Sequence, residues 1–231
     1  MLEKNIVIDL DKTIGYFDQF SYICRLIESY ENKGKNNKNI QSNILDELNY
    51  VFRPKIIDIL STIVNFRNKK LIENFILYTN NTNKLLISLI ITKLQSTLNT
   101  KKRLFDYVIV CKSKKKSLDD ILRKTNIEFN KFTYHEDYKS ICVIDDKRHK
   151  NLLIDNVFYI HCEPYIFEYS QNEIYSIVDK YLNISISDFL HDYNKKYKLY
   201  KNKILSEKNQ TEISNRILYY INMFILKAPI V

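Results

Sequence analysis

The chain has 231 residues, of which 45% are hydrophobic and 27% are charged, and its formal net charge is +9. This composition is typical of a folded protein and excludes an intrinsically disordered one, and the length suits one domain or one domain with an appendage. Its two glycines, Gly15 and Gly34, are too few for a P-loop or for a dinucleotide-binding fingerprint, so both kinds of nucleotide site are excluded.

Five short apolar runs, each followed by polar residues, predict buried strands. They span residues 4–10, 74–80, 105–111, 140–146 and 156–162. Two of the intervening segments, 83–98 and 115–126, have apolar residues at helical spacing. Alternating strands and helices predict an α/β fold with a central, mainly parallel, Rossmann-like sheet and helices on both faces.

Two regions do not fit this simple alternation. Residues 14–53 are too many for a tight connection after the first strand, and residues 17–30 within them have a helical pattern. We expect a helical insert there, either a small cap or an elaboration on the substrate side. The tail, 185–231, predicts a helical and basic C-terminal extension, which leaves residues 1–184 as the main domain.

Acidic or small polar side chains stand where three of the predicted strands end. They are Asp9 and Asp11, Thr79 and Asn80, and Asp145 and Asp146. The carboxyl ends of parallel strands lie at one edge of a sheet, so we expect these side chains to converge. Carboxylates this close need a cation between them, and hard oxygen ligands favour Mg²⁺.

This set of residue types suits phosphate chemistry. A carboxylate can attack phosphorus as a nucleophile, and a second one can protonate the leaving oxygen and later activate water. A hydroxyl and a lysine can stabilise the charge of the transferring phosphoryl group. Lysines are available at 112 and at 114–116, between the third and fourth predicted strands.

Three short segments, VIDLDKT (7–13), ILYTN (76–80) and VIDD (143–146), carry a resemblance to a known family. In this order and at these strand ends they resemble the aspartate-dependent phosphatases of the haloacid dehalogenase superfamily. FRPKIIDIL (52–60) is similar to the arginine-proline helix start of one group, the NLI-interacting-factor-like phosphatases of the RNA polymerase II carboxy-terminal domain. The layout of 156–182 also resembles that group, so the resemblance covers residues 5–182.

The resemblance implies a role for each acid. Asp9 matches the nucleophile, and Asp11 matches the general acid/base, whose main-chain carbonyl also helps to hold the metal. Asp145 matches a metal-binding acid. Asp146 stands where the polymerase-tail phosphatases usually have asparagine, although aspartate is common there in the wider superfamily. The metal set implied by the resemblance is therefore Asp9, Asp11, Asp145 and Asp146, with Mg²⁺ as the cofactor.

The resemblance also implies the phosphate-binding residues. Thr79 matches the phosphate-binding hydroxyl, with Asn80 beside it. Lys116 is the best match for the phosphate-binding lysine, although it lies further from Asp145 in the chain than the polymerase-tail group would have it. Three other lysines are alternatives for this role: Lys114, Lys115 and Lys139.

The function implied is that of a Mg²⁺-dependent phosphomonoesterase with an aspartyl-phosphate intermediate, whose substrate is a protein carrying phosphoserine or phosphothreonine. The expected helical insert at 14–53 departs from this, because the polymerase-tail phosphatases have a β-hairpin flap there. A nucleic-acid end phosphatase or a small-molecule phosphatase is the alternative, and the net charge and the basic segment 194–203 favour nucleic acid as a partner. A catalytically silent binding protein of the same fold is another.

The sequence also predicts a location. No apolar stretch reaches about 18 residues, the length that a membrane-spanning helix needs. The N-terminus lacks the layout of a secretory signal peptide. We therefore expect a soluble, intracellular protein, in the cytoplasm or nucleus, that has no membrane partner.

Overall fold

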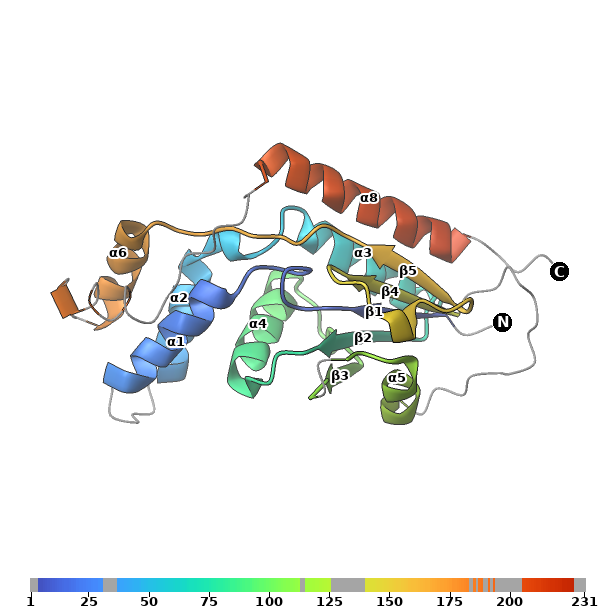
Figure 1. The fold of residues 1–231 in the computed structure, drawn as a ribbon, viewed down its shortest axis with the longest axis horizontal. Coiled ribbons are helices and arrows are strands. Elements are labelled where there is room, and N and C mark those ends of the chain that lie inside the picture. The colour runs from blue at the N-terminus through green and yellow to red at the C-terminus, as the bar shows by residue number, and fades with distance from the viewer. Residues whose placement is uncertain are drawn as a thin grey trace.

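The computed structural model describes residues 4–30, 37–112, 115–125, 140–182 and 205–226, together with residues 185, 187, 188, 191 and 193. Its centre is a sheet of five parallel strands in the order β3-β2-β1-β4-β5 (Figure 1). The strands are β1 (Asn5–Ile8), β2 (Asn74–Thr79), β3 (Tyr107–Val110), β4 (Ile141–Asp145) and β5 (Val157–His161). The five predicted strands and the parallel α/β fold class are thus confirmed.

Helices fill most of the connections between the strands. They are α1 (Asp18–Tyr30), α2 (Asn37–Glu47), α3 (Ile56–Asn68), α4 (Lys84–Thr97), α5 (Leu118–Thr125), α6 (Gln171–Leu182) and α8 (Glu207–Leu226). Two short 3-10 helices, η1 (Asn49–Val51) and η2 (Lys150–Leu152), complete the described elements. The start of α4 has a clear local cause, because the Asn83 side chain accepts a hydrogen bond of 3.1 Å from Leu86 N.

Alternate side chains of the strands face two separate apolar cores, as the pleat of a strand requires. Ile6 and Ile8 of β1 belong to the larger core, which also contains side chains of α1, α3, α4 and α8. Val7 points the other way, into a smaller core that is closed by Leu118 and Ile121 of α5. Both faces of the sheet are therefore covered by helices, as the sequence predicts.

The described part of the region 14–53 is largely helical, as expected. It contains α1, α2 and η1, and α2 packs against α4 and α6. In Figure 1, α1, α2 and α6 gather beyond the left-hand end of the sheet. Helices therefore lie near the loops that follow the strands.

The C-terminal helix α8 lies over the sheet, where it packs against α3, β4 and β5 (Figure 1). The buried Lys4 Nζ donates hydrogen bonds of 2.8 and 2.9 Å to the main-chain oxygens of Phe224 and Ile225, so the start of the described chain is tied to the end of α8. The predicted basic segment 194–203 falls outside the described residues. The boundary between a main domain and an extension at 184 stays a prediction.

Two further features concern the chain as a whole. Within the described ranges, no helix combines the length and the apolar character that crossing a membrane requires. All four cysteines are free and buried, and they pack as small apolar side chains: Cys24, Cys111, Cys142 and Cys162.

Candidate active site

The loop after β1 brings its acids to the edge of the sheet by a tight reversal. Lys12 N donates a hydrogen bond of 2.6 Å to Gly15 O, and Lys12 has a left-handed backbone with a φ of 66°. Gly15 is required by close packing, because a Cβ there would lie only 2.3 Å from Val51 O. One of the two glycines of the chain is therefore explained by this turn.

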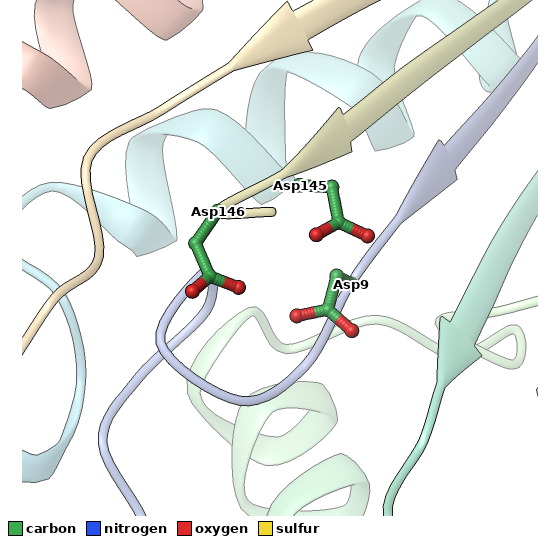
Figure 2. A group of neighbouring side chains, drawn as sticks. All are labelled: Asp9, Asp145 and Asp146. Carbon is green, nitrogen blue, oxygen red and sulfur yellow. The ribbon is translucent and has the colours of Figure 1, made fainter. Parts of the chain in front are cut away.

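Three carboxylates meet at the carboxyl ends of the neighbouring strands β1 and β4. Each of Asp9, Asp145 and Asp146 offers one oxygen, and these oxygens all lie within 4.8 Å of one another (Figure 2). β1 pairs with β4 so that Ile8 is opposite Ile144. The next residue along the chain is an aspartate in both cases, so this register brings Asp9 and Asp145 side by side. The all-oxygen donor set and the close spacing of like charges fit a Mg²⁺ ion held by these three residues.

Burial governs the electrostatics of these acids. Burial, together with the nearby Asp145 and Asp146, raises the pKa of Asp9 to about 7, although Lys116 opposes this shift. Burial and the charge of Asp145 also raise the pKa of Asp146. The opposite holds for Asp145, where His149 and Lys116 overcome burial and lower the pKa. Like charges in a buried site are therefore only partly compensated by the protein's own cation.

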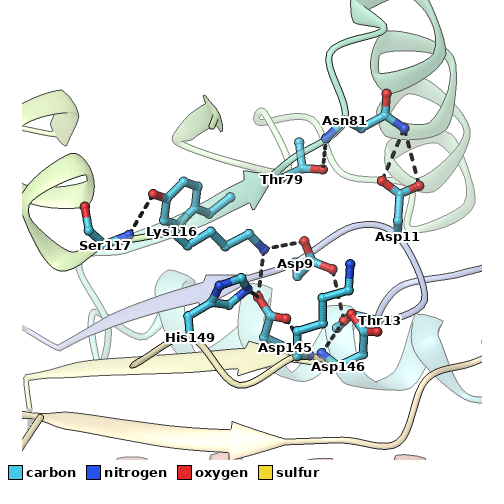
Figure 3. A network of polar contacts seen from close by, with 12 residues as sticks. Asp9, Asp11, Thr13, Thr79, Asn81, Lys116, Ser117, Asp145, Asp146 and His149 are labelled. Carbon is cyan, nitrogen blue, oxygen red and sulfur yellow. Dashed lines mark hydrogen bonds and ion pairs between the residues drawn. The ribbon is translucent and has the colours of Figure 1, made fainter. Parts of the chain in front are cut away.

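Lys116 is the cation that the fold brings to this cluster. Its buried Nζ donates to Asp9 Oδ1 and, at 2.7 Å, to Asp145 Oδ2 (Figure 3). Although burial alone would lower it, the two carboxylates raise the pKa of Lys116. The side chain lies 5.3 Å from the centre of the Tyr78 ring, and Ser117 N donates to Tyr78 Oη at 3.0 Å.

Of the two candidate lysines that the structure describes, Lys116 is shown in contact with the acids. Lys115 has an exposed side chain, and Lys114 and Lys139 lie outside the described residues.

Asp11 lies apart from the three-acid cluster. Its carboxylate oxygens accept hydrogen bonds of 3.2 and 3.3 Å from Asn81 Nδ2 (Figure 3). Burial raises the pKa of Asp11, and the bond from Asn81 acts against this shift. The carboxyl group is therefore oriented by the β2–α4 connection rather than by the other acids, and the roles of Asp11 in catalysis and in metal binding stay predictions.

Thr79 and Asn80 occupy different positions at the end of β2. Thr79 is fully buried, and its Oγ1 accepts a hydrogen bond of 3.0 Å from Asn81 N. Asn80 lines the open cavity, and its buried Oδ1 has no hydrogen-bond partner in the described part of the chain. The phosphate-binding role of both residues stays a prediction.

A cavity of about 290 Å³ opens over the acids. Of the predicted residues, all but Thr79 line it: Asp9, Asp11, Asn80, Lys116, Asp145 and Asp146. It is also lined by residues that the sequence analysis left out: Lys12, Asp18, Asn81, Lys147 and His149. A polar cavity of this size can admit a small charged group, such as the phosphoryl group of a phosphate ester.

Some contacting residues were not foreseen. Thr13 Oγ1 donates a hydrogen bond of 3.2 Å to Asp9 Oδ2 and accepts one of 3.0 Å from Asp146 N, so it connects the two acids. His149 Nε2 lies 3.5 Å from Asp145 Oδ2, a distance too long for a well-formed hydrogen bond. Thr13 is the last residue of the segment VIDLDKT (7–13), and its place in this segment was the signal by which the sequence could have indicated its role. Asn81 and His149 offered none beyond their nearness to Asn80 and Asp146.

Comparison with known proteins adds little to this geometry. No protein-family model matches the chain, and no curated protein matches it. Among solved structures, YfnB from Bacillus subtilis, described as a HAD-hydrolase bound to magnesium, is similar over 78% of this chain and 100% of its own, with 12% identity and a TM-score of 0.37. At that level of similarity nothing about the function follows, and the proposal below depends on the residues of the site.

Proposed function

We propose that this protein is a Mg²⁺-dependent phosphomonoesterase of the haloacid dehalogenase type, with Asp9 as its nucleophile. One observation carries the proposal: Lys116 Nζ bridges Asp9 and Asp145 inside a buried group of three acids at the carboxyl edge of a parallel sheet. Burying a lysine between carboxylates has a high desolvation cost, so a use of its charge in the site explains its presence better than a gain in stability does. That the protein belongs to the polymerase-tail phosphatases in particular stays a prediction.

The chemistry follows from the positions of the two acids of the β1 loop. In the first half-reaction, a bond forms between the Asp9 carboxylate and phosphorus while the ester P–O bond breaks, and Asp11 gives its proton to the leaving oxygen. In the second, Asp11 takes a proton from water, and the water oxygen attacks phosphorus. Inorganic phosphate leaves and the Asp9 carboxylate is restored.

The other residues of the cluster stabilise charge. Asp9, Asp145 and Asp146 would hold the Mg²⁺ ion, which when bound offsets the negative charge of the carboxylates and of the phosphoryl group. Lys116 Nζ is close enough to Asp9 to donate to the oxygens of a phosphoryl group attached there. Thr13 orients the second oxygen of Asp9 by its hydrogen bond.

For the substrate we propose a protein that carries phosphoserine or phosphothreonine. The cavity is open to solvent and of a size that admits one phosphorylated side chain. The nucleic-acid alternative depends on the net charge and on the segment 194–203, which falls outside the described residues. The expected location, in the cytoplasm or nucleus, also stays a proposal.

Hydrolysis of p-nitrophenyl phosphate tests the proposed activity. We expect turnover by the unaltered protein in Mg²⁺, reversible loss in EDTA, and a fall of at least about a thousandfold in Asp9→Asn, because a neutral amide cannot act as the nucleophile. Asp58→Asn, at an exposed aspartate of α3, is the matched control and should leave the rate unchanged. Retention of most activity in Asp9→Asn would rule out the proposed nucleophile.

A panel of phosphopeptides, nucleotides, sugar phosphates and nucleic-acid ends, assayed beside Asp9→Asn, tests the proposed substrate. We expect the highest kcat/KM for phosphoserine or phosphothreonine peptides. A higher value for phosphorylated nucleic-acid ends, falling steeply with salt, would replace the protein substrate by the alternative.

A further inference from the structure

Arg53 is almost fully buried at 1% exposure, yet among the described residues no carboxylate lies within ion-pair distance of its guanidinium group. Its Nε donates to Thr13 O at 2.7 Å, and its Nη2 donates to the main-chain oxygens of Lys12 and Glu163, both at 2.8 Å. Its Nη1 donates to Gln210 Oε1 at 3.1 Å. A buried cation without a counter-charge is costly, so these acceptors must compensate for the lost hydration.

Two of these acceptors belong to the loop that follows Asp9 and Asp11. Lys12 lies in the left-handed region of backbone conformation, which residues other than glycine adopt at a cost in energy. Arg53 also contacts this loop through its main chain, since Arg53 N donates to Ile14 O at 3.0 Å. Arg53 therefore holds the backbone of residues 12–14 in place with its side chain and with its main-chain amide.

The position of this backbone decides where the nucleophile points. Thr13 Oγ1 donates to Asp9 Oδ2 and accepts from Asp146 N, so a shift of the Thr13 backbone would move the hydroxyl that orients Asp9. Attack on phosphorus requires one carboxylate oxygen to be aligned with the ester bond, and a misplacement of about 1 Å can cost two orders of magnitude in rate.

Helix α8 holds Arg53 from the other side. The buried Gln210 provides the acceptor for Nη1, and Ser214 Oγ donates to Pro54 O at 2.6 Å. Both contacts join residues about 160 positions apart in the chain, with sequence separations of 157 and 160. The C-terminal helix thus supports the loop of the nucleophile through Arg53 without touching the cavity.

We propose that Arg53 is a positioning residue for the nucleophile, and that α8 completes the site by fixing Arg53 through Gln210. A lysine cannot take over this role, because its single ammonium group cannot reproduce the planar fork that reaches several oxygens at fixed angles. The effect on turnover rests on the proposed phosphatase activity. The effect on the conformation of the β1 loop does not.

The test compares Arg53→Lys with Arg67→Lys. Arg67 is a matched control at the other end of α3, because its guanidinium group also donates to main-chain oxygens, those of Leu104 and Arg103. In Arg53→Lys we expect kcat for p-nitrophenyl phosphate to fall at least about tenfold while KM changes less than about threefold. We also expect faster hydrogen exchange at the amides of Ile14 and Tyr16, which donate hydrogen bonds to Leu10 O and Val51 O.

Arg67→Lys should leave both readouts unchanged after correction for the folded fraction. The proposal is overturned if both variants lose activity only in proportion to their folded fraction and the two amides of the loop exchange as in the unaltered protein.

A second variant covers the case in which Arg53→Lys does not fold. Gln210→Met keeps Arg53 and the volume of the side chain but removes one acceptor, so the same changes are expected at a smaller size. Unchanged hydrogen exchange and an unchanged kcat in this variant would show that α8 does not fix Arg53 through Gln210. If the unaltered protein hydrolyses no phosphate ester, the proposed function fails, but hydrogen exchange in the loop still decides whether Arg53 positions it.

Discussion

Asp9 and Asp11 are two residues apart, but the structure gives their side chains different partners. Asp9 contacts Lys116 and Thr13 inside the buried cluster, whereas Asp11 accepts hydrogen bonds from Asn81. Because successive loop residues can point in different directions, one acid can serve as the nucleophile while the other faces the leaving group. The sequence places both acids at the site, but only the structure gives the hydrogen-bond partners of each side chain.

This separation predicts a dependence on the leaving group. Asp11→Asn should slow phosphoryl transfer from phosphoserine by about 10² to 10⁴-fold, because a serine alkoxide needs a proton to leave. Transfer from an aryl phosphate should be much less affected, because an aryl oxide leaves without one. Single-turnover measurements on both substrates, which exclude hydrolysis of the intermediate, make the comparison. Equal losses on the two substrates would contradict the acid role of Asp11.

At the scale of the element, the turn between β1 and α1 depends on close packing against η1. Gly15 forms isolated bridges with Asp11 and Phe52, and a Cβ on it would meet Val51 O at 2.3 Å and the Phe17 ring at 2.6 Å. The chain has no room for a methyl group at this position without moving main-chain atoms.

Gly15→Ala should therefore lower the free energy of unfolding by roughly 1–3 kcal/mol, the usual cost of overpacking a filled site. Urea unfolding followed by circular dichroism measures it. Ser88→Ala, at an exposed position inside α4, is the control and should change stability by less than about 0.5 kcal/mol. A Gly15→Ala protein as stable as the control would show that the turn is not packed as described.

The elements differ in how well the sequence predicts them. All five strands and the helices α1, α4 and α5 could be predicted from the sequence. A strand that is buried on both faces gives a continuous apolar run, and a helix that is buried on one face gives apolar residues at helical spacing. The packing of α8 over β4 and β5 could not be predicted, because an amphipathic helix shows which of its faces is apolar but not which surface covers it. The same limit hid the contact between Arg53 and Gln210.

At the scale of the whole molecule, the cluster of acids links stability to the metal. Burial and the neighbouring Asp145 raise the pKa of Asp146, which means that its charged form is unfavourable in the folded protein. A bound cation removes this repulsion. Mg²⁺ should therefore raise the free energy of unfolding by about RT ln(1 + [Mg²⁺]/Kd).

Asp146→Asn should thus have opposite effects with and without the ion. Without Mg²⁺ we expect Tm to stay the same or to rise by a few degrees, because one buried charge is removed. With Mg²⁺ we expect the increase in Tm seen for the unaltered protein to become smaller or vanish. Thermal unfolding in EDTA and in a series of Mg²⁺ concentrations measures both. An undiminished increase in Asp146→Asn would exclude Asp146 from the metal site.

The site as a whole was only partly predictable. The convergence of Asp9, Asp145, Asp146 and Lys116 follows from the rule that carboxyl ends of parallel strands share an edge, apart from the choice among the lysines. The sequence favours Lys116 but leaves Lys114, Lys115 and Lys139 as alternatives, and of these three the structure describes only Lys115. The sequence could not show that Thr79 is fully buried and does not line the cavity, since the side chain at the end of a strand can face either side of the sheet.

Trapping the intermediate tests the central claim, that Asp9 attacks phosphorus, most directly. Asp11→Asn keeps the nucleophile but lacks the base for hydrolysis, so the phosphorylated enzyme should accumulate when it is mixed with p-nitrophenyl phosphate and Mg²⁺. After an acid quench, mass spectrometry of the peptides should find one phosphoryl group on Asp9, and none when Asp9→Asn is combined with Asp11→Asn. A phosphoryl group on another residue, or a burst of p-nitrophenol without any phosphorylated peptide, would contradict the account.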